Sequence, residues 1–576
     1  MFGGSKYFGF RGQRLNLAVG IIAGIDFFLF GYDQGVTGGL LTLGTWVKQF
    51  PEIDSVHNPT NNHISTIQGI TVASYNVGCF IGAIITIFIG DILGRRKMIF
   101  MGSAIMVIGA TLQTTAFSLP HLIVGRIITG FGNGMNTSTV PTWASETSKS
   151  HKRGKMVMIE GAMITGGICL SYWVDFAFSY LDPNPVSWRF PIALQIVFAL
   201  FLLALILEMP ESPRWLILRG NEDEAMNVIA ALENLPVEHH IVQTEFMEIK
   251  DTVLETKAHG WADLFTMGPE RNFHRVVLGY VNQVFQQVSG INLITYYAPT
   301  IYKQYINLGD TTSSVLAACN GTEYFIASWF AVYTIERFGR RTLMLVGVAG
   351  MSGSMAILAG MNYISQRDAA AAIARGQPLS GATPSGIVSA TFLFVFNTFF
   401  AVGWLGMTWL YPAEIVPLKI RAPANGLSTS ANWAFNFMVV MITPVAFSSI
   451  GYKTYVIFAV INAFIFPVVY FFYPETAYRS LEEIDNIFRK TKSGWAGCLD
   501  VVRVAREEPR RYGKNGELLL EYEATVSSDV RARRRVGGGA GAGAHESKES
   551  KGKEAEHVET GSGDSSTFEK KAYAHV

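Results

Sequence analysis

The stretch GDILGRRK (90–97) lies between two long apolar runs, and a second copy, ERFGRR (336–341), lies between two more such runs far along the chain. In both copies an acid precedes a glycine and two arginines. Glycine permits a tight turn between two helices. Arginine supplies forked donors for carboxylates and for the carboxyl ends of helices. The repeat therefore predicts two homologous halves, each with a tight turn that carries paired charges.

Two further pairs of motifs repeat in the same order. Glu146 precedes Arg153 as Glu414 precedes Arg421, and PESPR (210–214) corresponds to PETAY (474–478). Three ordered repeats predict two six-helix halves, with the substrate site near the midplane between them. The charged groups can latch the halves together at one face; alternatively, the basic residues only set membrane orientation. The residues expected to gate that face are Asp91, Arg95, Arg96, Glu146, Arg153, Glu336, Arg340, Arg341, Glu414 and Arg421.

The composition is that of a membrane protein. Of the 576 residues, 49% are hydrophobic and only 16% are charged. A run of about 20 apolar residues spans a bilayer, and runs without alternation are helices and not barrel strands. We therefore predict an all-α polytopic fold with twelve transmembrane helices. The twelve runs are 15–40, 67–90, 98–118, 120–142, 155–178, 189–209, 273–302, 313–335, 342–363, 385–411, 424–450 and 453–473.

The loops predict orientation and domain limits. Lys and Arg cluster in the loops on one side of the predicted membrane, which the positive-inside rule makes cytoplasmic together with both termini. The composition of the last residues is too polar to form a core. The predicted parts are a cytoplasmic N-terminus (1–14), an N-terminal six-helix bundle (15–209), a cytoplasmic linker with short helices (210–272), a C-terminal six-helix bundle (273–473) and a mostly disordered cytoplasmic tail (474–576).

One acid stands inside the first apolar run, in FGYDQG (30–35). A carboxylate at membrane depth costs at least ~2.5 kcal/mol and commonly marks an ion or proton route. Asp33 is therefore predicted to be a proton site. The alternative is that Asp33 caps or hinges a helix broken by Gly31 and Gly35.

Eight motifs resemble the sugar porter family of the major facilitator superfamily over about residues 15–490. They are GDILGRRK (90–97), GRIITGFGNG (125–134), PTWASETSKSHKRG (141–154), PESPRWL (210–216), QQVSGINLITYYAP (286–299), ERFGRR (336–341), YPAEIVPLKIRAPANG (411–426) and PETAYRSLEEID (474–485). Within that family, stretches 159–176 and 188–204 are most similar to fungal glycerol– and hexose–proton symporters. The resemblance implies the major facilitator fold and transport of a sugar.

The resemblance also implies roles for single residues. Asp33 and Arg126 correspond to the proton-coupling pair of the family. The implied substrate-binding residues are Gln286, Gln287, Asn292, Tyr297, Trp409 and Asn432, with Tyr296 near the outer gate and Trp433 beside the site. Amides donate and accept as hydroxyls do, and an indole offers an apolar face and one N–H. For Trp409 and Trp433 the alternative is packing or interfacial anchoring.

The sequence departs from the family at three cavity positions, which hold Gly161, Tyr324 and Ala401. Two further acids, Glu160 and Glu323, lie beside two of these positions. Each can contact a polyol hydroxyl, take part in the proton path or pair locally. The departures put the family's glucose specificity in doubt.

We therefore expect a fungal plasma-membrane carrier that moves a monosaccharide or polyol with a proton by alternating access. The alternatives are a facilitative uniporter and a nutrient sensor that does not transport. No nucleotide loop, nucleophile motif or metal spacing is present, so we expect no enzyme activity, no metal and no cofactor besides the coupling proton. The expected partners are the substrate and membrane lipid, without nucleic acid, and the expected functional unit is a monomer.

Overall fold

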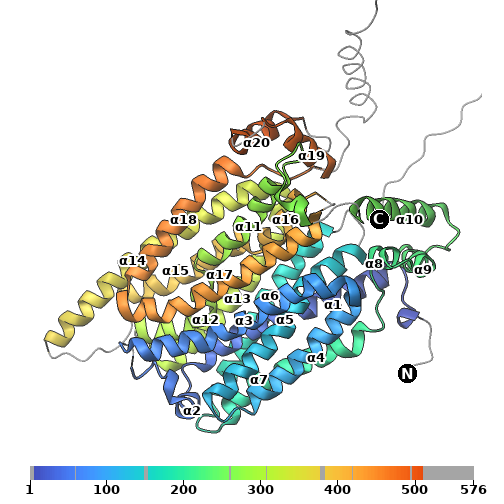
Figure 1. Cartoon of the computed structure of the whole chain (residues 1–576). Helices are drawn as coiled ribbons and strands as arrows, with labels where there is room; N and C mark the ends of the chain where they lie inside the picture. Colours follow the sequence, from blue (N-terminus) through green and yellow to red (C-terminus); the bar gives the residue numbers. More distant parts are fainter. Residues whose placement is uncertain are drawn as a thin grey trace, which may run out of the picture. The chain divides into compact units, whose positions relative to one another are not determined.

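The structure, a computed structural model, describes residues 6–58, 60–147, 153–257, 261–306, 308–375, 383–417, 420–479, 481–492 and 496–509. Six long helices make up the first half (Figure 1). They are α1 (Gln13–Leu40), α3 (Asn62–Leu93), α4 (Arg95–Thr114), α5 (Leu119–Thr147), α6 (Arg153–Ser179) and α7 (Val186–Ile206), with a short α2 (Gly44–Gln49) after α1. Each long helix coincides with one predicted apolar run.

The second half repeats the pattern, with two of its helices interrupted. Its helices are α11 (Asn272–Val288) and α12 (Ile291–Thr300), α13 (Asp310–Phe338), α14 (Arg340–Ala374), α15 (Pro384–Phe400) and α16 (Met407–Ile415), α17 (Arg421–Ile450) and α18 (Lys453–Phe472). Gly290, at φ 100°, separates α11 from α12, and a π-helical turn, Ala401–Leu405, separates α15 from α16. The all-α fold is as predicted.

Nine spans within the described residues are long and apolar enough to cross a membrane. The three other predicted runs correspond to α5, to α11 with α12, and to α13. All three are helical, and Gly290 divides the second of them into helices of 17 and 10 residues. In α5 the buried face carries polar side chains such as Arg126, Asn133 and Asn136. Burial inside the protein, away from lipid, accounts for this polarity. Exposed apolar side chains such as Phe88 and Phe464 fit contact with lipid.

The predicted glycine turns are present in both halves. Gly94, at φ 86°, joins α3 to α4, and Gly339, at φ 82°, joins α13 to α14. Positive φ favours glycine because it has no Cβ. The two turns place the arginines that come after them at the same end of their helices, which we call the basic end. The opposite end of the helices is called the far end.

The two halves meet mainly along two helix pairs, α3 with α17 and α6 with α13. Within the first half, α1 and α6 approach closely, since a Cβ on Gly31 would collide with the carbonyl oxygen of Ile164. This close packing fixes the acidic residues of α1 inside the protein.

Short helices come after each half at the basic end. Residues 210–272 include α8 (Pro213–Leu218), α9 (Glu222–Glu233) and α10 (His240–Lys257), which share a small apolar core with Leu15. After α18 come α19 (Leu481–Lys490) and α20 (Ala496–Glu507), which lie beside the end of α18 in Figure 1. Helix α20 corrects the expectation of disorder for this part of the tail. Its Val501, Val502 and Ala505 are buried. Residues 510–576 lie outside the described part.

Candidate functional site

Five buried amide side chains of the second half form one continuous hydrogen-bonded chain. Asn292 Nδ2 donates to Gln287 Oε1, and Gln287 Nε2 donates to Gln286 Oε1 at 3.0 Å. Asn432 Nδ2 donates to Gln286 Oε1 at 2.9 Å and to Gln283 Oε1 at 2.7 Å. Every member is at most 6% exposed. Amides can exchange these internal bonds for bonds to a polyhydroxylated substrate. We call this set the amide chain.

The two helix interruptions position the amide chain. Gly290 adopts a left-handed conformation that ends α11 and starts α12. Carbonyl oxygens at the start of α16 accept bonds from α11, and Pro412, which has no N–H, leaves the Thr408 carbonyl without its helical donor. Asn282 donates to the Met407 carbonyl at 3.2 Å, and Gln283 donates to the Thr408 carbonyl at 3.1 Å. Irregular backbone inside a membrane protein commonly lines a substrate path, because its polar groups need partners there.

A second polar group joins the two halves beside the amide chain. Asn76 Nδ2, on α3, donates to Asn436 Oδ1, on α17, at 2.9 Å. The Tyr296 hydroxyl donates to Asn76 Oδ1 at 3.5 Å, and the Tyr297 hydroxyl donates to the Val440 carbonyl at 2.9 Å. Tyr296, predicted to lie near the outer gate, therefore contacts the first half, whereas the hydrogen bond of Tyr297 stays within the second half.

Both predicted tryptophans pack against aromatic rings of the first half. Trp409 meets Phe27 edge-on, with centroids 6.2 Å apart. Trp433 meets Phe30 at 5.3 Å and Tyr75 at 6.4 Å. The indole Nε1 of Trp433 is buried with no hydrogen-bond partner among the described residues. This packing agrees with the alternative stated for the two rings, and their role in binding stays a prediction.

Asp33 and Arg126 lie in one buried cluster and interact electrostatically. Arg126 donates to the Thr37 hydroxyl, to the Thr71 carbonyl at 3.0 Å and to the Val72 carbonyl at 2.8 Å. Thr37 lies one helical turn beyond Asp33 on α1. Within the described chain no ion pair joins Asp33 to Arg126, and Asp33 Oδ2 has no hydrogen-bond partner.

A second acid of α1, Asp26, was not predicted. It is 1% exposed and accepts a hydrogen bond from Asn136 at 2.8 Å. Its charge interacts with that of Glu160 on α6, which is 3% exposed. Asp26 Oδ2 and Glu160 Oε1 are both buried without a hydrogen-bond partner in the described part of the chain. The signal available in the sequence was an acid two helical turns before Asp33, on the same helix face.

Glu323 pairs locally with a neighbouring helix. Thr398, on α15, donates to Glu323 Oε1 at 2.5 Å. The carboxylate lines a pocket of about 530 Å³ whose other residues include Trp173 and Phe330. These contacts favour the third of the roles considered for Glu323, local pairing.

The far end is closed between the halves. The Tyr172 hydroxyl of α6 donates to the Thr295 carbonyl of α12 at 2.5 Å. Gly38 of α1 lies so close to α12 that a Cβ on it would stand 2.7 Å from the Tyr296 carbonyl oxygen. Hydrogen bonds cross between the halves at mid-helix and at the far end.

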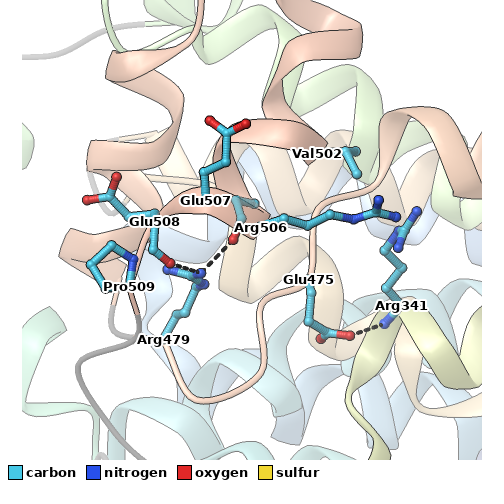
Figure 2. A pocket seen from close by; sticks show the side chains of 9 residues that line it. Arg341, Glu475, Arg479, Val502, Arg506, Glu507, Glu508 and Pro509 are labelled. Atoms are coloured by element: carbon cyan, nitrogen blue, oxygen red, sulfur yellow. Dashed lines mark hydrogen bonds between the residues drawn. The ribbon is translucent and has the colours of Figure 1, made fainter. Parts of the chain in front are cut away.

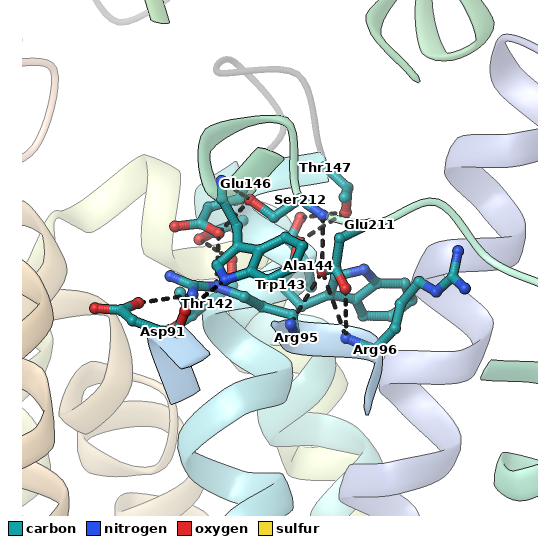
Figure 3. A network of polar contacts seen from close by, with 12 residues as sticks. Asp91, Arg95, Arg96, Thr142, Trp143, Ala144, Glu146, Thr147, Glu211 and Ser212 are labelled. Atoms are coloured by element: carbon teal, nitrogen blue, oxygen red, sulfur yellow. Dashed lines mark hydrogen bonds and ion pairs between the residues drawn. The ribbon is translucent and has the colours of Figure 1, made fainter. Parts of the chain in front are cut away.

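The motifs of the first half form one charged network at the basic end (Figure 3). Arg95 contacts Glu146 at 3.2 Å and Asp91 at 2.9 Å. Glu211 accepts backbone N–H groups from Arg95 at 3.0 Å and from Arg96 at 3.2 Å. The Ser212 hydroxyl donates to Glu146 at 2.6 Å. Burial raises the pKa of Glu211, while these N–H groups act in the opposite direction.

The second half repeats this network. Arg340 contacts Glu414 at 2.9 Å, and the Thr476 hydroxyl donates to Glu414 at 2.6 Å. Glu475 accepts the backbone N–H of Arg340 at 2.8 Å and that of Arg341 at 3.1 Å. Position by position, these contacts match those of the first half. The sequence repeat is therefore a structural repeat.

The second arginine of each motif binds a carbonyl oxygen at the end of the last helix of its half or just after it. Arg96 donates to the Met209 carbonyl at 2.9 Å, and Arg341 donates to the Tyr470 carbonyl at 2.6 Å. Arg421 donates to the Val416 carbonyl at 3.0 Å. The side chains of two other predicted gating residues, Arg153 and Glu336, lie outside the described part of the structure.

Two ion pairs of these networks each lie within one half. Arg95 meets acids of the first half, and Arg340 meets Glu414 of the second. A latch between the two halves stays a prediction, because the side chains of Arg153 and Glu336 lie outside the described residues. The networks tie the helix ends of each half into a rigid unit. The spacing of the motifs could not distinguish the two cases, because both copies carry the same charges.

Other participating residues were missed from the sequence. Glu211 and Glu475 anchor the two glycine turns, and the repeated PES and PET motifs were their signal. Gln283 extends the amide chain one turn before Gln286, which the helical period indicates. The pair Asn76 and Asn436 has no local signal, because it joins segments remote in the sequence.

Comparisons with known proteins agree with this geometry. The family described as "Sugar (and other) transporter" matches residues 19–488. The sugar transporter STL1 of Saccharomyces cerevisiae is 38% identical over 492 residues, which cover 84% of this chain and 83% of that protein. The low-affinity glucose transporter HXT1 of the same yeast is 31% identical over 81% of this chain and 80% of its own length.

A solved structure has the same fold. The proton:xylose symporter XylE, bound to 6-bromo-6-deoxy-D-glucose, superposes with a TM-score of 0.67. The match covers 82% of this chain and 99% of that one, at 23% sequence identity. At this identity the likeness establishes the fold.

Proposed function

Because this chain belongs to the sugar transporter family of the major facilitator superfamily, we propose that it carries a monosaccharide or polyol across the membrane together with a proton. It is a multi-pass membrane protein whose family carries sugars. The coupling proton, the binding residues and inward transport are parts of this proposal. The carrier changes no covalent bond of its substrate.

The amide chain is the observation that carries the proposal. Each free sugar hydroxyl both donates and accepts, and an unpaired hydroxyl in a desolvated site costs about 1–3 kcal/mol. The buried amides of α11, α12 and α17 offer donors and acceptors in one continuous row. Trp409 and Trp433 lie at the contact between the halves, where their indole rings can cover the apolar face of a sugar ring.

Asp33 and Arg126 are proposed to couple transport to the proton. In this conformation Arg126 is satisfied by a hydroxyl and two carbonyl oxygens. A buried carboxylate with no cationic partner is costly, so this arrangement suits a protonated Asp33. When Asp33 loses its proton, its charge competes with Thr37 for the guanidinium. Such a switch makes protonation depend on conformation.

Alternating access is proposed to result from the rigid networks. The far end is closed by contacts of α1 and α6 with α12, while the ion pairs Arg95–Glu146 and Arg340–Glu414 each hold helix ends of one half together. The halves can therefore rock about the substrate site as units. The basic end is proposed to face the cytoplasm, with both termini, in a plasma membrane. The carrier is proposed to work as a monomer, without metal, further cofactor or nucleic acid.

Uptake in a yeast strain without its own sugar carriers tests the proposal. Labelled glucose, xylose, lactose, cellobiose and glycerol are offered singly and in competition. We expect saturable uptake of at least one, and substrate-dependent alkalinisation of the medium. If uptake is saturable but the substrate concentration inside the cells never exceeds that outside, the protein is a uniporter. Binding of a sugar without any flux would leave a sensor.

A further inference from the structure

A pocket of about 350 Å³ opens at the basic end of the second half, away from the amide chain. It lies between the start of α14, the segment after α18 and the helix α20 (Figure 2). Three arginines line it: Arg341, Arg479 and Arg506. The proposed transport cycle uses Arg341 only through its contacts with Glu475 and Tyr470.

Two of these guanidinium groups gather on one aromatic ring. The Cζ atom of Arg341 lies 5.0 Å from the ring centroid of Tyr470, and that of Arg506 lies 5.8 Å from the same centroid. Figure 2 shows the two side chains reaching toward each other across the pocket. Their like charges repel. An anion between them would remove this repulsion and accept from both forks.

The acids of the lining are engaged elsewhere. Glu475 accepts backbone N–H groups, including that of Arg341. Glu508 pairs with Lys490 at 2.6 Å, and Glu507 lies 3.9 Å from Arg503. In the described part of the chain, Arg506 makes no hydrogen bond or ion pair, and Arg341 Nε is buried without a hydrogen-bond partner. The donors that remain available therefore face the pocket.

The pocket stands beside the lipid-facing side of α18. Tyr470 is 42% exposed and Phe471 is 52% exposed, and Phe464 continues the exposed apolar side at 63%. Apolar side chains at this position contact acyl chains, and the end of the helix lies at the level of the headgroups. Basic pockets at such a level suit anionic headgroups.

We propose that this pocket binds the phosphate of an anionic phospholipid headgroup, with the acyl chains along α18. The phosphate bridges Arg341 and Arg506 and so fastens α20 to the second half. The group bound is a phosphate monoester carried by the headgroup, because it can hold two negative charges and accept from both guanidinium groups, whereas the phosphodiester that joins the headgroup to glycerol holds one. Its source is the membrane and not a soluble phosphate, because the pocket adjoins the exposed face of α18.

The test uses the purified full chain in detergent and short-chain phosphatidylinositol 4-phosphate. Short-chain phosphatidylcholine and soluble inositol 1,4-bisphosphate are the comparison ligands. Arg506→Gln removes the guanidinium group that α20 contributes to the pocket. Arg489→Gln is the matched control, since it makes the same charge change on the neighbouring helix α19, but its guanidinium pairs with Glu270 at 2.8 Å, outside the lining. Binding is measured by native mass spectrometry, and the unliganded melting temperatures confirm folding.

We expect the wild-type chain and Arg489→Gln to bind the phosphoinositide, and Arg506→Gln to bind it roughly tenfold more weakly. Phosphatidylcholine should not compete. Equal affinities in the two variants, or no binding by the wild-type chain, would overturn the site. Equal affinity for inositol 1,4-bisphosphate would overturn the membrane as the source of the ligand.

Discussion

Asp33 and Arg126 share one buried cluster without forming an ion pair in the described structure. Arg126 is held instead by Thr37, one helical turn along α1, and by carbonyl oxygens of α3. In this state Thr37 accepts a hydrogen bond from Arg126, and Asp33 forms no ion pair with a described residue. The contact gives the coupling proposal a definite switch, in which one guanidinium has two alternative partners on the same helix.

Replacing Asn432 by Ala should weaken substrate binding. Asn432 joins Gln283 to Gln286, so its loss removes bonds to the substrate and disorders the amide chain. The apparent KM should rise roughly tenfold, as expected for a lost buried hydrogen bond. Asn362→Ala is the control, since Asn362 is equally buried but bonds to Leu358 and Ser389. Equal KM values for the two variants at equal surface density would remove Asn432 from the site.

Neutralising Glu146 should destabilise the first half. Glu146 and Arg95 are each 12% exposed, whereas Asp91, the other partner of Arg95, is 66% exposed. Breaking the more buried pair should cost about 1–3 kcal/mol, and the exposed pair less than about 1 kcal/mol. The melting temperature of Glu146→Gln should therefore fall further than that of Asp91→Asn. The reverse order would show that the network does not hold the helix ends together.

Adding a methyl group at Gly38 should hinder closure of the far end. Its Cβ would stand 2.7 Å from the Tyr296 carbonyl oxygen, so the closed state becomes strained. A cysteine introduced at Gln68 reports this, because that position is buried in the closed state. Labelling from outside should increase in Gly38→Ala and turnover should fall. Gly353→Ala is the control, as its Cβ would meet nothing within 4 Å. Unchanged labelling in Gly38→Ala would contradict the assignment of this end as the closed gate.

Shortening the tail at two positions should reveal the contribution of α20 to stability. A chain ending after Pro509 keeps the buried Val501, Val502 and Ala505, whereas one ending after Lys492 loses them. Each buried valine contributes about 1.5–3 kcal/mol. The chain ending at Lys492 should therefore melt at a lower temperature, and the chain ending at Pro509 should melt and transport as the full chain does. Identical melting of the two would mean that α20 adds no stability.

The long helices and the glycine turns could be predicted from the sequence. Apolar runs of spanning length leave the backbone no alternative to helix, and a glycine between two such runs marks a turn with positive φ. The repeat also predicted which residues gather at the basic end. It could not predict whether Arg95 meets an acid of its own half or of the other half, because that depends on the packing of the halves.

The polar interior was only partly predictable. The amides of α11, α12 and α17 were implied by resemblance, but the pair Asn76 and Asn436 arises only when α3 packs on α17. Asp26 was hidden in an apolar run that already contained one notable acid. Helix α20 was missed because it is a short helix followed by a long polar stretch, and the burial of its valines depends on the surface of the second half.

Asp33→Asn is the decisive variant for proton coupling, because it fixes the side chain in a neutral form of nearly the same shape. Labelled substrate and the pH of the medium are followed together in cells or vesicles. We expect the variant still to bind substrate and to exchange it across the membrane. We also expect that it neither accumulates substrate against a gradient nor takes up protons with it. Accumulation with proton uptake at the wild-type level in Asp33→Asn would contradict the assignment of Asp33 as the coupling site.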